Sequence, residues 1–199
     1  GIALVAIGGL RLMQADTFDF GDAHTSARGK MLHRSKRALD YVLSLEGIEA
    51  ETRTEGQLYL AQVVFSLGDA GKAQQLALQT LEDARRFELT WLIARSQRVL
   101  GSIFVGQDQR EEAVQYFEQA RRMFSKAGMR LELARTMREY GEVLLKWYEG
   151  DASRKGEQEY RRGLDYVRES VKIFRECGAE LDLKLAERVM ERYKVTEKA

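Results

Sequence analysis

Few residue types in this chain could take part in catalysis or hold a metal. The two histidines, His24 and His33, are nine residues apart, whereas two ligands on one helix face need a spacing of i, i+4. We expect both histidines at the surface. The single cysteine, Cys177, precedes Gly178, which we expect to end a helix, so we predict a small packing residue rather than a nucleophile.

Phosphate-binding and dinucleotide-binding glycine motifs are absent, as is any cluster of cysteine and histidine with metal-ligand spacing. The adjacent carboxylates Glu111 and Glu112 stand where a helix should begin, and there they suit the helix dipole without a catalytic role. We therefore expect no enzyme activity, no catalytic residue, no metal and no cofactor.

Paired arginines are the more informative feature. The stretch "ARSQRVLGSI" at 94–103 returns as "ARTMREYGEV" at 134–143, so that Arg95 and Arg98 match Arg135 and Arg138. A guanidinium fork holds carboxylates or phosphates bidentately, and an array of four would suit an acidic partner. The alternative is internal salt bridges, for which the carboxylates available nearby are Glu132, Glu139 and Glu142.

A basic run, "RGKMLHRSKR" at 28–37, stands apart from these arginines. It is typical of the solvated face of a helix, and the alternative is a basic docking patch. The formal net charge of the whole chain is only +1, and no aromatic platform accompanies the run. Binding of nucleic acid is therefore not indicated.

Apolar spacing predicts the elements that carry these residues. In "REEAVQYFEQARRMFSKAG" the apolar positions recur at three and four, which predicts a helix that Gly128 ends in a left-handed cap. The chain has no proline and 17 glycines, consistent with helices joined by short glycine-bearing turns. The same reasoning predicts helices near 2–13, 24–45, 51–67, 70–87, 90–106, 109–127, 131–148, 156–177 and 181–196.

The N-terminal stretch "GIALVAIGGL" is apolar but too short to span a membrane, which needs about 20 residues. The absence of an initiator methionine leads us to expect a segment of a longer, multidomain protein. One cysteine allows no internal disulfide, and we expect a cytoplasmic location.

The helices repeat with a step of forty residues. Forty residues separate Leu60, Leu100 and Tyr140, and also Val64, Phe104 and Leu144. In the last unit the second helix comes fifty residues later, so that Gly178 matches Gly128. The ten additional residues, "EGDASRKGEQ", are expected to form a mobile surface loop.

The segment "LGSIFVGQDQREEAVQYFEQA" resembles a tetratricopeptide repeat. The residues that carry the resemblance are Leu100, Gly101, Phe104, Ala113, Phe117 and Ala120. Ser125 stands where the common 34-residue repeat has proline. The longer step is similar to the long repeats of maltose-activator-like bacterial regulators and multidomain signalling ATPases.

The resemblance implies an all-α fold, a right-handed α-α superhelix (a solenoid) of about four helix pairs with a C-terminal closing helix. We expect one solenoid domain over 1–199. Its parts would be a divergent helix pair at 1–46, repeats at 54–87, 94–127 and 134–177, and the closing helix at 181–196.

The resemblance further implies a scaffold or regulatory module that binds a protein or peptide in a concave groove lined by the first helix of each pair. The expected groove residues are Leu58, Gln62, Phe65, Arg95, Arg98, Ser102, Arg135, Arg138 and Glu142, with Glu55, Val105 and Leu145 at equivalent positions. An acidic partner suits the arginines, and no membrane partner is expected. The alternatives are a sensor of a small anionic or sugar-like ligand and a spacer for self-association.

Overall fold

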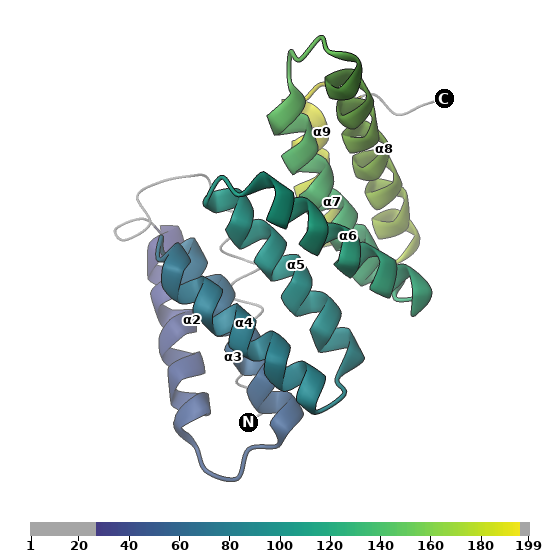
Figure 1. Ribbon diagram of the computed structural model, residues 1–199. Helices are drawn as coiled ribbons and strands as arrows, with labels where there is room; N and C mark the ends of the chain where they lie inside the picture. Colours follow the sequence, from purple (N-terminus) through teal and green to yellow (C-terminus); the bar gives the residue numbers. More distant parts are fainter. Residues whose placement is uncertain (1–26, 196–199) are drawn as a thin grey trace. The chain divides into compact units, whose positions relative to one another are not determined.

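The computed structural model describes residues 27–195 of the chain, and it is all-α over that range (Figure 1). The helix expected near 2–13 and the residue His24 lie outside the described residues. Each helix expected from residue 24 onward is present wherever the structure describes it, and the range contains no strand. The helices are α2 (Ala27–Ser44), α3 (Ala50–Ser66), α4 (Ala70–Arg86), α5 (Thr90–Gly106), α6 (Arg110–Lys126), α7 (Arg130–Tyr148), α8 (Arg154–Glu176) and α9 (Glu180–Arg192).

Glycine ends two of the helices as the sequence predicts. Gly128 adopts a left-handed conformation (φ 66°) after α6, and Gly178 does the same (φ 64°) after α8. After α6 the Met129 N–H donates to the Phe124 carbonyl at 3.0 Å, while the Gly128 N–H donates to the Ser125 carbonyl at 3.2 Å. This pair of bonds is a Schellman motif, which turns the chain sharply toward the next helix.

The chain divides into two compact units. Unit 1 runs up to Tyr116 and unit 2 begins at Phe117, so the border falls within α6. Each unit has its own buried side chains and its own helix contacts, and each is described by itself below. The single domain expected from the sequence remains a prediction.

In unit 1, α3 contacts three other helices, α2, α4 and α5. Leu32 and Leu39 of α2 pack with Val63 of α3 in a fully buried cluster. Further along, the rings of Phe104 and Tyr116 stack with their centroids 5.4 Å apart. Apolar contacts between neighbouring helices therefore hold the unit together.

In unit 2, two glycines bring α7 and α8 into close contact. A Cβ at Gly141 would lie 3.0 Å from the Gly163 carbonyl oxygen, and a Cβ at Gly163 would lie 3.0 Å from that of Gly141. The buried ring of Phe117 stacks on that of Tyr140 at 5.1 Å. Helix α9 then covers a second buried cluster that includes Phe174.

The ten residues expected to form a surface loop do so only in part, because 149–153 form an exposed turn while 154–158 begin α8. Compared with α5, α6 and the turn between them, two of the residues lengthen α7, two lengthen the turn and six lengthen α8. The new helix start is well capped: the Ser153 side chain accepts the Gly156 N–H at 3.0 Å, and Asp151 accepts the Ser153 N–H at 2.9 Å. The polar composition of "EGDASRKGEQ" concealed a helix start that provides its own hydrogen bonds.

Cys177 also differs from the expectation. Its side chain is exposed rather than packed, because the residue caps α8 at the point where the chain turns away from the core. Its repeat equivalent Ala127 is exposed too, so the match between the two positions was correct and the inference of burial was not.

Candidate groove surface

The first helices of successive pairs meet within each unit. In unit 1, α3 contacts α5, and in unit 2, α7 contacts α9. The groove positions expected from the sequence fall on α3 and α5 in unit 1 and on α7 in unit 2. We refer to these positions, taken for each unit by itself, as the groove-facing surface.

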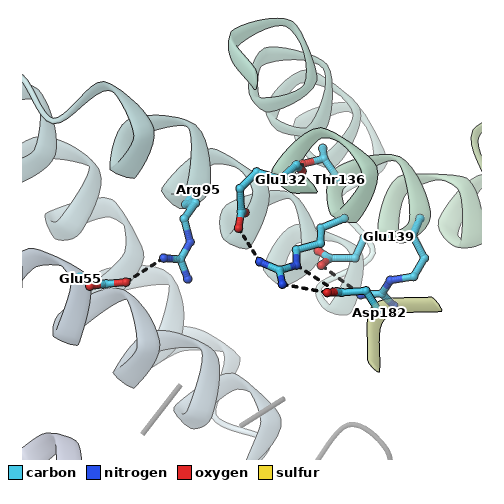
Figure 2. A network of polar contacts seen from close by, with 8 residues as sticks. Glu55, Arg95, Glu132, Thr136, Glu139 and Asp182 are labelled. Atoms are coloured by element: carbon cyan, nitrogen blue, oxygen red, sulfur yellow. Dashed lines mark hydrogen bonds and ion pairs between the residues drawn. The ribbon is translucent and has the colours of Figure 1, made fainter. Parts of the chain in front are cut away.

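Arg95 joins the first helices of unit 1. Its Nη1 donates to Glu55 Oε1 at 3.0 Å, across a separation of forty residues (Figure 2). The guanidinium lies 4.8 Å from the ring centroid of Tyr59 and 5.4 Å from that of Trp91. A carboxylate and two aromatic faces thus fix the orientation of this arginine.

A second bond runs parallel to this one. Trp91 Nε1 donates to Glu51 Oε1 at 2.9 Å, again across forty residues. Because Glu51 and Glu55 are one turn apart on α3, as are Trp91 and Arg95 on α5, the two bonds form neighbouring rungs between the same helices. Sequence reasoning missed Glu51, Tyr59 and Trp91, although the forty-residue spacing of opposite partners was a usable signal.

The remaining α5 residues of the expected site are less accessible than predicted. Arg98 is only 5% exposed, and its burial was not foreseen. The Ser102 hydroxyl donates to the Arg98 carbonyl at 3.5 Å, and this side chain is half-buried. Neither residue offers a fully open polar group to a partner.

On α3 the expected site residues have three different environments. Leu58 is fully buried, so its predicted exposure is wrong; α3 packs against three helices and leaves no open face there. Gln62 is half-buried, and within residues 27–195 its buried Oε1 accepts no hydrogen bond. Phe65 is half-buried with its ring directed at Gly106, where an added Cβ would lie 2.8 Å from the ring.

Arg135 is the most strongly held of the arginines. Its Nε and Nη2 donate to the two carboxylate oxygens of Asp182 on α9, at 2.9 and 2.8 Å. Its Nη1 donates to Glu132 Oε1 at 2.6 Å, so two carboxylates hold the same guanidinium. Burial alone would lower the pKa of Arg135, but the bonds and charges of Asp182 and Glu132 outweigh it and raise that pKa.

Arg138, one turn further along α7, is held far less firmly. Its Nη2 contacts Glu139 Oε1 at 3.4 Å, and in the described part of the chain its buried Nε has no acceptor. Glu142, the next expected site residue, accepts a 2.7 Å hydrogen bond from Arg192 of α9. Leu145, expected to be exposed, is fully buried in a cluster with Val167, so that expectation is wrong.

Ion pairs thus join three of the predicted arginines, Arg95, Arg135 and Arg138, to carboxylates. Glu132 and Glu139 were foreseen as partners, whereas Asp182 was missed because the inserted residues break the forty-residue register in the last unit. Arg95 and Arg98 belong to unit 1, and Arg135 and Arg138 to unit 2. A joint array of all four therefore stays a prediction.

A second polar cluster lies inside unit 2, at the contact of α6, α7 and α8. The Arg162 guanidinium hydrogen-bonds the buried Tyr140 hydroxyl and lies over the rings of Tyr140 and Tyr166, 5.2 and 5.8 Å from their centroids. Tyr166 donates to Glu118 at 3.3 Å. Burial raises the pKa of the Tyr140 hydroxyl, which therefore stays protonated as a neutral packing group.

A hollow of about 690 Å³ opens beside α8 in unit 2. Met137, Val171 and Met190 provide its apolar lining. Its charged residues are of both signs, and several are paired with one another or with neighbours, as Arg168 is with Asp165 at 3.2 Å. This balance gives the hollow no preference for an anionic ligand.

Over 27–195, no group of three or more histidine, cysteine, aspartate or glutamate side chains is arranged to hold a metal ion. In the same range, no helix is both long and apolar enough to cross a membrane.

Arg95 and Glu55, which join α3 and α5, lie in a segment that matches a known family. The family model named Tetratricopeptide repeat aligns with residues 53–126, which include α4, α5, α6 and most of α3. Residues 53–126 are tetratricopeptide repeats. Such repeats generally mediate protein–protein interactions, and proteins built from them are typically scaffolds rather than enzymes.

Solved structures extend this likeness to the fold of the rest of the chain. The crystal structure of BtubC (BKLC) from P. vanneervenii matches with a TM-score of 0.54 and 14% identity, over 96% of this chain and 89% of that one. The crystal structure of a putative kinesin light chain from Podosopora anserina, with nearly identical TPR-like repeats, matches with a TM-score of 0.46 and 18% sequence identity. The match covers 94% of this chain and 98% of that one. No curated protein matches the sequence. The likeness to the BtubC structure shows an all-α fold, and the family model shows tetratricopeptide repeats over 53–126, both in agreement with the sequence.

Proposed function

We propose that this chain is a protein-interaction module that binds an acidic segment of a partner on its groove-facing surface, with Arg138 receiving a partner carboxylate. The family relation of residues 53–126 supports the interaction role. The long ion pair of Arg138 with Glu139 supports Arg138 as the position that binds the partner. We further propose that the module serves a larger cytoplasmic signalling or transcription regulator, which rests on the resemblance of its long repeats to those of such proteins.

The state of the Arg138 guanidinium is the observation that carries the proposal. Its side chain is 15% exposed, its one ion pair is long at 3.4 Å, and its Nε lacks an acceptor in the described residues. A buried donor without a partner costs about 1–3 kcal/mol, and that cost would be removed if the side chain turned outward and a bidentate carboxylate bound it. A carboxylate therefore gains more free energy by binding Arg138 than by binding Arg135, whose guanidinium is already hydrogen-bonded to Asp182 and Glu132.

A neighbouring arginine contributes to binding indirectly. Within unit 2, Arg135 is fixed to Asp182, so α7 and α9 are cross-linked before a partner arrives. A surface that does not have to become ordered on binding loses less entropy. Arg135 thus holds this part of α7 in place while Arg138 makes the new contact.

The same cross-links favour a second candidate function, a self-supporting spacer. In a spacer, the ion pairs of Arg95 and Arg135 would serve only to join neighbouring helices. The two functions differ in what happens at Arg138, because a spacer gains nothing from a guanidinium that makes only one long ion pair.

Selection from a phage-displayed library of random peptides tests the proposal. We expect enriched peptides to carry Asp or Glu, and Arg138→Ala to weaken their binding about tenfold or more in fluorescence anisotropy while the unfolding free energy changes by less than about 0.5 kcal/mol. Lys146→Ala, at an exposed position of the same helix, is the matched control. Failure to enrich any peptide, or equal binding by the Arg138 and Lys146 variants, would favour the spacer.

A further inference from the structure

Helix α2 carries a basic ridge, which we define as Lys30, Arg34 and Arg37 together with Tyr41. Their spacing of i, i+4, i+7 and i+11 places all four on one face of the helix. All four are exposed, whereas Leu32 on the other side of α2 is fully buried. The ridge is therefore an outward surface of a helix that is anchored by its apolar face.

The three cations of the ridge are not neutralised within the described residues. None of Lys30, Arg34 and Arg37 makes an ion pair or a side-chain hydrogen bond there. This contrasts with Lys36 on the flank of the same helix, which pairs with Asp40 at 2.6 Å. Three uncompensated charges within about 11 Å of helix, at 1.5 Å per residue, give this face a local positive potential although the chain is nearly neutral overall.

Tyr41 adds an apolar contact at the end of the ridge. Its side chain is 60% exposed, the highest value among the large hydrophobic residues reported as exposed in the described chain. A half-polar aromatic ring beside basic residues is a common anchor in protein interfaces, because it contributes apolar area and keeps its hydroxyl solvated.

Among the helices from α2 to α5, α2 contacts α3 alone, and Figure 1 shows α2 beside α3 at the edge of that group. The ridge also lies on a second helix of a pair, so it is separate from the groove-facing surface on α3 and α5. An occupant of the ridge would not need the Arg138 site.

We propose that the basic ridge docks an acidic amphipathic helix of a partner protein, with carboxylates at i, i+4 and i+7 opposite the three cations and an apolar residue against Tyr41. The regular spacing along one helix face suits another helix, whose side chains follow the same period. A membrane surface would need several large apolar residues to insert, and the ridge has one. Single-stranded nucleic acid would need stacking platforms for successive bases, and the ridge again has one ring.

The test uses an alanine-based helical peptide of about 20 residues with glutamates at i, i+4 and i+7 and leucine at i+11. We expect it to bind the full chain in fluorescence anisotropy, and the substitutions Lys30→Gln, Arg34→Gln and Arg37→Gln together to weaken binding about tenfold or more. Lys72→Gln, Arg85→Gln and Lys126→Gln, at exposed positions elsewhere, remove the same charge as a matched control. Tyr41→Ala should weaken binding several-fold.

Circular dichroism would confirm that each variant is folded before its affinity is compared. A peptide of the same composition with its glutamates spread around the helix should bind less tightly than the matched one. Equal loss in the ridge and control variants, or equal affinity for the two peptides, would overturn the proposal. Tighter ridge-dependent binding of phosphatidylserine vesicles or of a single-stranded oligonucleotide than of the peptide would also overturn it, in favour of that other class of partner.

Discussion

Arginine at one repeat position has different partners in the two units. Arg95 bonds backward along the chain, to Glu55 of the preceding first helix, whereas Arg135 bonds forward, to Asp182 of the following one. The repeated arginine therefore joins neighbouring first helices in both units. Its carboxylate partner lies on the preceding first helix in unit 1 and on the following one in unit 2.

Arg135→Ala should destabilise unit 2 by about 2 kcal/mol or more. The substitution leaves the Asp182 carboxylate, which is 4% exposed, without its bidentate partner in a place that water hardly reaches. Chemical denaturation measures the loss. The double variant with Asp182→Ala should cost clearly less than the two single changes added together, and strict additivity would mean that the two side chains are not coupled.

The positions of the helices could be predicted from local features of the sequence. The three-and-four spacing of apolar residues, the forty-residue step and the caps at Gly128 and Gly178 predicted the helices well. The burial of Leu58 and Leu145 was not predicted, because a helix that contacts several others loses the exposed face that a two-helix pattern implies. The pairing of Arg135 with Asp182 depends on the folded spacing of helices, which no local pattern contains.

Phe117→Ala should cost about 3–5 kcal/mol, because it removes a fully buried ring that stacks on Tyr140 and leaves a cavity between helices. Thermal melts followed by circular dichroism would show the change. Gln119→Ala, on the exposed side of the same helix, is the control and should be close to neutral. A melting temperature for Phe117→Ala equal to that of the control would contradict the assignment of Phe117 to the core.

Ser153→Ala tests whether the inserted residues form a real helix start. The hydroxyl accepts the Gly156 N–H at 3.0 Å, and loss of such a cap typically costs about 1 kcal/mol. Urea denaturation can detect a difference of this size. If the segment were a mobile loop, as its composition first suggested, the substitution would leave stability unchanged.

At the scale of the whole molecule, stability is expected to come from contacts between neighbouring helices, as in other repeat proteins. Within unit 2, α9 lies at the end of the described chain and covers a buried cluster that contains Ala134, Val171 and Phe174. Removing it would expose an apolar face with nothing to replace the lost contacts. The role of α9 as a closing helix is thus a prediction about solubility as well as about fold.

Deletion of residues 181–199 should therefore promote association of the chain, since the exposed cluster would be buried between copies. Multi-angle light scattering after size exclusion would report the mass. The substitution Arg188→Gln in the full chain keeps the helix while changing an exposed residue, and it should leave the mass unchanged. A truncated chain that stays monomeric and as stable as the full chain would contradict the role of α9 as a closing helix.

Chemical-shift mapping by NMR tests the central claim most directly, and a chain of 199 residues is within reach of the method. The acidic peptide chosen by selection would be titrated into the labelled chain, with Arg138→Ala as the comparison. We predict that the largest shifts fall on the groove-facing surface of α7 around Arg138 and Glu142, and that they vanish in the variant. Shifts confined to the second helices α4, α6 and α8, or shifts that persist in Arg138→Ala, would contradict the proposed groove site.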